Sequence, residues 1–282
     1  MSNISFILFS YNEEKRIEYI VRNLAPYGQV FVLDDGSTDR TQEIAERFGA
    51  RFVRRPSDPE SKLAETQLML DFVKSIIYTD WIFWGYTDNF LPKTLLDKFM
   101  EISKQNRHKY VYVPIDTYLW GETDHPIIRA AYPNFFHKDY VDFTGNRLHG
   151  FGKFLGDKGQ ILRLPWEKKY AICHYSLYNL EKFVTKHLAY AGFEAEDKIG
   201  HGLKFRVIYL LMSPARYFYL FYKRGWRAGV RGLYASMLYS FFRLMVAVRL
   251  YELENGLDLQ TIEAEFAKAK KRIVDDVERG KA

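Results

Sequence analysis

The chain has 282 residues, enough for one large domain or for a domain with an appendage. Hydrophobic residues make up 48% of it and only 9 residues are proline, a composition that excludes a largely disordered protein. The single cysteine, Cys173, excludes a disulfide framework and is typical of a reducing compartment. The net charge of +6 is compatible with several partners, so the position of the charges has to decide between them.

The first apolar run, residues 4–9, ends in the polar sequence SYNEE at residues 10–14. No basic stretch precedes the run, and Ser10 and Asn12 cut it short, so it predicts a strand and not a signal peptide. Because the run is apolar throughout, we expect helices on both faces of this strand. Apolar residues at helical spacing follow, which predicts a helix that starts near Ser10 or Asn12.

The second apolar run, residues 30–33, ends in the sequence DDGSTD at residues 34–39. We expect Ser37 or Thr38 to cap a helix that ends at Gly49. The carboxylates of Asp34 and Asp35 would repel a phosphate, so hydrogen bonds from a base or a ribose suit them better. The alternative is that both acids only form the turn and cap the helix.

Strand-like segments recur at residues 51–53, 81–84 and 110–113, with helical patterns at 63–77 and 93–104 between them. This alternation predicts an α/β fold with a mostly parallel sheet. Parallel strands present their carboxyl ends at one edge of the sheet, where ligands of such folds bind. Residues 115–170 are rich in glycine and predict long loops, which usually carry substrate contacts.

Asp88 follows the strand-like segment at 81–84 and should stand at the same edge as Asp35. One carboxylate suffices for Mg²⁺ or Mn²⁺ when a diphosphate and water supply the other oxygen ligands. His174, in the sequence AICHYS, is a second candidate ligand, although a single histidine is more often a structural hydrogen-bonding residue.

Residues 200–250 combine nine lysines and arginines with many aromatic residues and contain no Asp or Glu. No uncharged run there reaches the roughly 20 residues of a spanning helix. The pattern favours helices in the headgroup layer of an anionic membrane, and a helix pair with a solvated basic face is the alternative. Nucleic acid is disfavoured, because the cations stand among bulky aliphatic residues. Beyond Asp258 the pattern predicts an amphipathic helix.

The sequences SYNEE, DDGSTD and TDN at residues 87–89 resemble the nucleotide-sugar site of family 2 glycosyltransferases, which have the GT-A fold. Residues 219–252 also resemble the bacterial subgroup that builds lipopolysaccharide core or other lipid-linked glycans. The resemblance implies a GT-A catalytic domain at 1–176 and a helical region at 177–282, with 200–252 on the membrane. It further implies a cytoplasmic protein, peripheral on the inner face of the cytoplasmic membrane.

Carried onto this sequence, the resemblance implies a role for each matching residue. Tyr11 would pack on the nucleobase and Asp35 would accept a hydrogen bond from it, while Asp88 and His174 would hold Mn²⁺ or Mg²⁺. The remaining expected nucleotide-sugar residues are Ser10, Asn12, Glu13, Asp34 and Thr87. The implied reaction inverts the anomeric carbon as a sugar moves from a UDP-sugar to a lipid-linked or other cell-envelope glycan acceptor.

The sequence departs from the family pattern at three places. Tyr86 replaces the first acid of the Asp-X-Asp motif, Glu65 stands in a segment where relatives often have arginine and asparagine, and Gly150 replaces a glutamate. The catalytic candidates are therefore His149 and Asp142, with Glu122 and Asp157 as further possible bases. A degenerate, membrane-associated scaffold that binds nucleotide-sugar stays open. So does a sugar-phosphate nucleotidyltransferase, although the glycine-rich basic loop of that class is missing.

Overall fold

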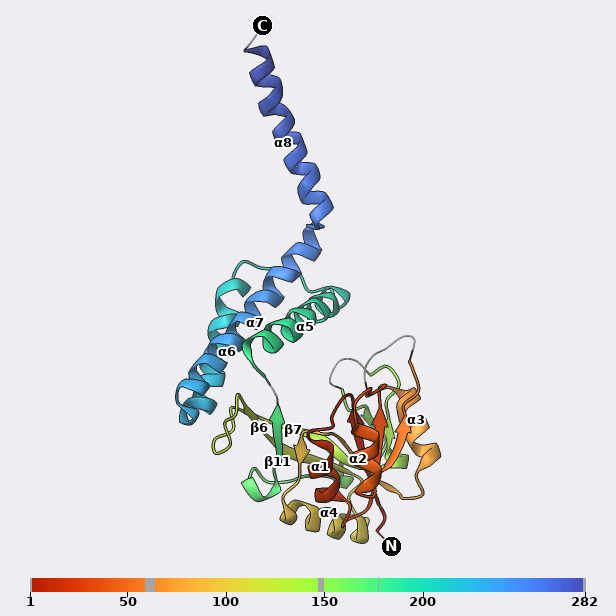
Figure 1. The fold of residues 1–282 in the computed structure, drawn as a ribbon. Helices are drawn as coiled ribbons and strands as arrows, with labels where there is room; N and C mark the ends of the chain where they lie inside the picture. Colours follow the sequence, from red (N-terminus) through yellow and green to blue (C-terminus); the bar gives the residue numbers. More distant parts are fainter. Residues whose placement is uncertain (1, 59–63, 147–149, 177, 281–282) are drawn as a thin grey trace. The chain divides into compact units, whose positions relative to one another are not determined.

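The computed structural model describes residues 2–58, 64–146, 150–176 and 178–280. The chain divides into two compact units, Met1–Ser176 and Leu177–Ala282. The first unit is a β-sheet flanked by helices, and the second consists of helices (Figure 1).

Within the described residues of the first unit, nine strands form one sheet, in the order β3-β2-β1-β4-β7-β6-β11-β5 with β10 beside β6. The strands are β1 (Ile4–Ser10), β2 (Gln29–Asp34), β3 (Arg51–Arg54), β4 (Trp81–Tyr86), β5 (Asn89–Phe90), β6 (Tyr110–Leu119), β7 (Ile128–His137), β10 (Ile161–Arg163) and β11 (Ile172–Ser176). Strands β1 to β4 are mutually parallel, and β7 is antiparallel to both of its neighbours. The expected α/β fold with a mostly parallel sheet is confirmed.

Both faces of the sheet are covered. Three helices, α1 (Ile17–Leu24), α2 (Thr41–Arg47) and α4 (Lys93–Gln105), pack their apolar residues on one face. Helix α3 (Gln67–Ile76) and the segment that carries β8 (Val141–Asp142) and β9 (Lys153–Phe154) cover the other. All seven residues of β1 are buried, which explains the unbroken apolar run from Phe6 to Phe9. Short 3₁₀ turns are η1 (Lys138–Tyr140), η2 (Lys158–Gln160), η3 (Lys168–Tyr170) and, in the second unit, η4 (Trp226–Ala228).

Three predicted helix starts are wrong. Helix α1 begins at Ile17, several residues after Asn12, and α2 begins at Thr41 without a side-chain cap from Ser37 or Thr38. The polar residues ahead of these helices bond the neighbouring loop instead of the helix end, as the site below shows. Helix α3 begins at Gln67, later than residue 63, because the Thr66 hydroxyl accepts a hydrogen bond from the Met69 amide and caps the helix there.

The prediction of long loops over residues 115–170 is also wrong in part. Strand β6 continues to Leu119, and β7 then crosses the sheet for ten residues. The carboxyl half of β7 is buried, and Phe135 stacks on Trp81 and on Phe99 with ring centroids 4.7 Å and 4.0 Å apart.

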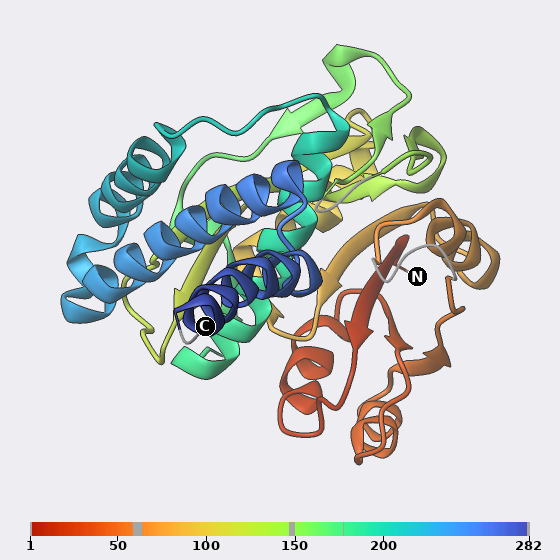
Figure 2. The same ribbon diagram turned by 90° about the horizontal axis from the view of Figure 1, so that it is seen from above.

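The second unit contains α5 (Leu180–Gly200), α6 (Tyr209–Gly225), α7 (Val230–Asn255) and α8 (Leu259–Arg279). Helices α5 and α6 both pack against α7, as Figure 2 shows. Gly232 allows the closest approach, because a Cβ atom there would lie only 1.9 Å from the Gly225 carbonyl oxygen. Arg243 of α7 donates to both carboxylate oxygens of Glu194 in α5, at 2.7 Å and 2.8 Å. This ion pair fixes the two helices in register.

His187 lies in the aromatic interior of the helical unit. It is buried, its ring stacks on Phe183 with centroids 3.7 Å apart, and the edges of Tyr239 and Phe242 meet it. The Nδ1 atom lies 2.8 Å from the Phe183 carbonyl oxygen. Burial lowers the pKa of His187 below its ordinary 6.5, so the neutral ring is the folded form near neutral pH.

This burial predicts a pH dependence of stability. As the pH falls below about 6.5, the unfolded chain binds a proton at His187 before the folded chain does, so the free energy of unfolding decreases. Replacing His187 by Leu should flatten the loss of melting temperature between pH 6.5 and pH 5. Calorimetry of this variant, with the exposed His125→Leu as control, checks the prediction. An equally steep decline in H187L would contradict it.

Candidate active site

The carboxylate of Asp34 organises the loop after β2. It is buried and accepts hydrogen bonds from the amides of Gly36 and Ser37, both at 2.7 Å, and from the Ser37 hydroxyl at 2.5 Å. Gly36 has a φ of +94°, a backbone conformation that glycine adopts without strain. The turn itself therefore occupies the Asp34 carboxylate. These contacts are those of the turn-forming alternative, and the contact of Asp34 with the nucleotide stays a prediction.

The loops after β1 and β2 are bonded to each other. The Asn12 amide donates to the Ser37 hydroxyl, and the Thr38 amide donates to Asn12 Oδ1, both at 2.8 Å. The Glu13 amide donates to the Thr41 hydroxyl at 2.7 Å. The Asn12 side-chain oxygen thus has a structural partner. The outcome is a fixed double loop at the carboxyl edge of the sheet.

Two predicted nucleotide contacts stay accessible on this double loop. Tyr11 is 59% exposed, and the side chain of Asp35 is 55% exposed. Arg55 Nε donates to Asp35 Oδ1 at 2.7 Å, so this arginine orients Asp35 and is not a free cation for a diphosphate. Ser10 is buried at the end of β1, and its hydroxyl has no hydrogen-bond partner among the described residues.

Asp88 and His174 meet across the sheet, although 86 residues separate them. Strand β11 lies between β6 and β5, so that His174 pairs with Thr117 on one side and Asn89 on the other. His174 Nε2 is 3.1 Å from Asp88 Oδ2, and the Tyr175 amide donates to the Asp88 carbonyl oxygen at 3.0 Å. The structure thus brings together the two predicted metal ligands.

The donor set of this pair suits a divalent cation. Thr117 Oγ1 lies 3.1 Å from His174 Nδ1, so the hydroxyl can accept a hydrogen bond from that nitrogen in the tautomer that leaves Nε2 available to a cation. Within the described residues, no group of three or more His, Cys, Asp or Glu side chains gathers to hold a metal ion. Two protein ligands are compatible with a Mg²⁺-type or Mn²⁺-type site that takes its other oxygens from a diphosphate and water.

Charges around the pair come from the loop after β1. Burial alone would raise the pKa of Asp88. His174 and Arg16 have the larger, opposite effect together, so the pKa lies below its ordinary value of 3.8. Burial and the Asp88 charge raise the pKa of Glu13 against the effect of Arg16, whose Nη2 donates to Glu13 Oε1 at 2.6 Å. The buried Thr87 also hydrogen bonds to Glu13. Arg16 therefore offsets the mutual repulsion of the Glu13 and Asp88 carboxylates.

The structure adds a residue that the sequence reasoning did not place in the site. The Tyr86 hydroxyl donates to Glu65 Oε1 at 2.5 Å, and the Asn146 amide group donates to the Glu65 carbonyl oxygen at 2.9 Å. Glu65 is buried, whereas Tyr86 is 38% exposed. Both residues depart from the family pattern, and the structure joins them by a hydrogen bond. The presence of two departures in one sequence was the only sign in the sequence that these residues are in contact.

This bond should orient Tyr86 at the edge of the site. Tyr86→Phe keeps the ring and removes the hydroxyl, which leaves the buried Glu65 carboxylate without its donor. We expect a loss of about 1–3 kcal/mol in stability. Glu65→Gln keeps an acceptor for the Tyr86 hydroxyl and should lose less. Urea unfolding of Y86F and E65Q measures both, and equal stabilities of Y86F and the unaltered protein would contradict the assignment.

The catalytic candidates do not converge on the pair. His149 lies outside the described residues. Asp142 accepts a hydrogen bond from the Thr144 amide at 2.8 Å, and its bonds to Thr144 keep its pKa below 3.8, so it is a poor base and no described bond joins it to Asp88 or His174. Glu122 Oε1 accepts three amide hydrogen bonds from the loop that follows it. Asp157 caps η2. None of these three stands out as a base.

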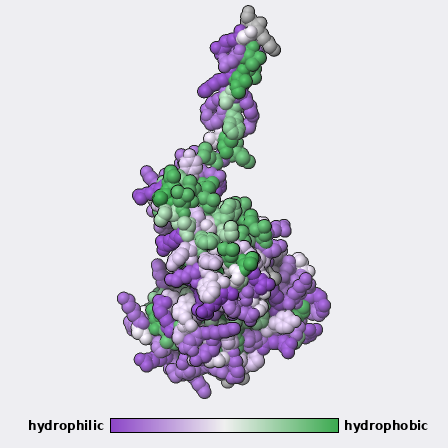
Figure 3. Space-filling view, turned by 90° about the vertical axis from the view of Figure 1, so that its left-hand side faces the viewer, coloured by the Kyte–Doolittle hydropathy of each residue, from purple (hydrophilic) through white to green (hydrophobic). Residues whose placement is uncertain are grey.

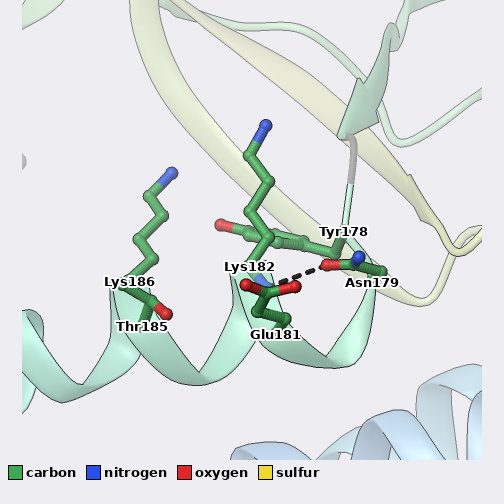
Figure 4. A pocket seen from close by; sticks show the side chains of 6 residues that line it. All are labelled: Tyr178, Asn179, Glu181, Lys182, Thr185 and Lys186. Carbon is green, nitrogen blue, oxygen red and sulfur yellow. Dashed lines mark hydrogen bonds between the residues drawn. The ribbon is translucent and has the colours of Figure 1, made fainter.

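A separate hollow of about 650 Å³ lies along the first turns of α5 in the helical unit (Figure 4). Asn179 caps the helix by accepting a hydrogen bond from the Lys182 amide at 2.8 Å. The Lys186 ammonium lies 5.4 Å and 5.5 Å from the ring centroids of Tyr178 and Tyr190. The hollow contains none of the predicted site residues, so the strand edge defines the candidate active site.

Comparison with known proteins identifies the class. A model of Glycosyl transferase family 2 matches residues 5–184. The chain therefore belongs to glycosyltransferase family 2, and it is a glycosyltransferase. It is 29% identical over 266 residues to an uncharacterized glycosyltransferase of Rickettsia bellii (strain RML369-C), covering 89% of this chain and 86% of that protein. A counterpart in Rickettsia felis (strain ATCC VR-1525 / URRWXCal2) is 26% identical, covering 89% and 90%.

Among solved structures, the chain is similar to glucosyl-3-phosphoglycerate synthase from Mycobacterium tuberculosis. Its complex with Mn²⁺, UDP-glucose and phosphoglyceric acid is 24% identical, with a TM-score of 0.31 over 42% of this chain and 44% of that one. The complex with phosphoglyceric acid alone is 18% identical, with a TM-score of 0.40 over 64% and 74%.

Proposed function

We propose that this glycosyltransferase is metal-dependent and inverting, and that it moves a sugar from a UDP-sugar to a lipid-linked or cell-envelope glycan acceptor. The observation that carries the proposal is the Asp88–His174 pair, 3.1 Å apart at the carboxyl edge of the sheet. The accessible Tyr11 and Asp35 stand at the same edge and suit a nucleobase.

Each residue then has a stated task. Tyr11 offers its face to the base, and Asp35, held by Arg55, accepts a base N–H. Asp88 and His174 would hold Mn²⁺ or Mg²⁺, and that cation supplies charge neutralisation for the leaving diphosphate. Thr117 fixes the orientation of the His174 ring. An acceptor hydroxyl attacks the anomeric carbon after it loses its proton to a base, for which the described residues offer no clear candidate.

The metal site predicts a dependence of UDP binding on two side chains. Asp88→Asn and His174→Ala should each weaken Mn²⁺-dependent binding of UDP by at least about tenfold, because each removes a ligand. Titration calorimetry with UDP, with and without Mn²⁺, measures this effect. The matched control is Asp97→Asn, an exposed acid on α4. Unchanged Mn²⁺-dependent affinity in both D88N and H174A would overturn the metal assignment.

A catalytically degenerate scaffold remains the second candidate, because Tyr86 and Gly150 stand where the family has acids. A panel of UDP-sugars with Mn²⁺ separates the two. Sugar transfer or slow donor hydrolysis supports the enzyme, and metal-dependent UDP binding without turnover on any acceptor supports the scaffold.

We also propose that the helical unit attaches to an anionic membrane surface. Large apolar side chains are exposed on α6 and α7, among them Leu211, Met212, Trp226, Val230 and Met237. Figure 3 shows hydrophobic side chains gathered over this unit. The cations beside them have no acidic residue in residues 200–250, which favours anionic lipid.

One helix among the described residues, α7, is long and apolar enough to cross a membrane by length and composition. The sequence argues against such a helix, because no uncharged run there reaches roughly 20 residues. Arg243 in the middle of α7 is paired with Glu194 and lies 4.6 Å from the Tyr217 ring centroid. These contacts join α7 to its neighbouring helices, which favours the interfacial arrangement.

Charge reversal tests the membrane proposal. Arg224, Arg227 and Arg231 are exposed, and each basic residue near an anionic surface contributes roughly 1 kcal/mol to attraction. Their triple change to Glu should lower binding to phosphatidylserine vesicles at least a hundredfold in co-sedimentation. The control changes Lys93, Lys104 and Arg107 of the other unit to Glu. Equal losses in both triple variants would contradict a specific surface.

A further inference from the structure

Helix α8 carries an apolar stripe that nothing in the described chain covers. None of its 21 residues is buried. Leu259, Phe266, Ile273 and Val277 are each more than half exposed, and Ile262 is 36% exposed. In proteins, most of the stability of a helix comes from the packing of its apolar face. The stripe therefore requires a partner.

The charges of α8 distinguish it from the rest of the helical unit. The helix has five acidic residues, Glu263, Glu265, Asp275, Asp276 and Glu278, and five basic ones, Lys268, Lys270, Lys271, Arg272 and Arg279. A helix of zero net charge gains little from an anionic surface, unlike residues 200–250. Its mixed charges instead suit a partner that carries the same mixture.

We propose that α8 is a dimerisation helix that pairs with α8 of a second copy of this chain in an antiparallel coiled coil. The small or apolar residues Leu259, Ile262, Phe266, Ala269 and Ile273 follow the spacing of alternating three and four residues that such a seam requires. This inference is independent of the catalytic proposal.

The antiparallel register gives well-matched layers at the centre of the helix, whereas Leu259 faces Asp276 at its ends. With the two helices centred between Ala267 and Lys268, Phe266 faces Ala269 of the second copy, and Ile262 faces Ile273. The first layer sets a large residue against a small one and the second joins two branched side chains, so neither layer is crowded or empty. A parallel pairing would place Phe266 on Phe266 and Ala269 on Ala269, which produces one crowded layer and one empty layer.

The same register pairs opposite charges beside the seam. Glu263 faces Lys270 of the second copy and Glu265 faces Arg272, and two-fold symmetry repeats each pair. Within one helix, Lys270 already reaches Glu263 at 2.9 Å, which shows that these side chains extend along this face. A parallel dimer would pair only Glu265 with Lys270 in this way. The charge pattern thus specifies orientation as well as association.

Light scattering on the full chain in detergent, corrected for bound detergent, tests the association. We expect twice the 33.4 kDa chain mass. Phe266→Asp with Ile273→Asp should yield single chains. The paired variants E263K/E265K and K270E/R272E should each dimerise at least tenfold more weakly, and an equimolar mixture should recover the dimer. A single-chain mass for the unaltered protein at micromolar concentration overturns the proposal, as does a mixture that fails to recover it.

Disulfide trapping tests the orientation. Ile262→Cys mixed with Ile273→Cys should cross-link on oxidation, whereas Ile262→Cys alone should not, because its copies lie roughly 16 Å apart along an antiparallel pair. The unaltered chain, with only Cys173, is the control. Efficient cross-linking of I262C with itself would indicate a parallel pair and overturn the register. If the unaltered protein is monomeric and the F266D/I273D variant no longer binds vesicles, the apolar stripe of α8 contacts lipid and the dimer proposal is wrong.

Discussion

The three hydrogen bonds that Asp34 accepts determine much of the donor site. They close the turn after β2, and the closed turn holds the Ser37 hydroxyl where the Asn12 amide reaches it. The Thr38 amide in turn donates to Asn12 Oδ1. As a result, Tyr11 and Asp35 are left outward on a rigid edge. The more buried acid of the pair shapes the site, and the exposed one is available to a ligand.

A second constraint comes from the insertion of β11 between β6 and β5. Pairing with β6 and β5 fixes the register of β11. A shift of β11 by one residue would turn the His174 imidazole to the other face of the sheet. The Asp88–His174 contact is therefore a result of sheet register, which local sequence does not encode.

The motifs at the ends of β1, β2 and β4 predicted the sheet edge correctly, because parallel strands that are buried on both faces leave continuous apolar runs. They did not predict which polar atoms would be used up internally. Ser37 and Thr38 are residue types that often cap helices. Here the Ser37 hydroxyl and the Thr38 amide form hydrogen bonds with Asn12 of the neighbouring loop instead. Similarly, β7 was missed because its buried half includes Asn134, which bonds the Trp84 carbonyl oxygen, so its pattern is not purely apolar. The Glu65–Tyr86 bond joins residues 21 apart, which sequence spacing alone does not reveal.

The strand that carries His174 is also the last element of the first unit, which ends at Ser176. Only Tyr175 lies between the imidazole and that end, and its amide is bonded to the carbonyl oxygen of Asp88. Residues 174–176 therefore serve two purposes at once, as a side of the candidate metal site and as the end of the sheet-bearing unit. Any change in the pairing of β11 would displace the His174 imidazole and the backbone contact to Asp88 together.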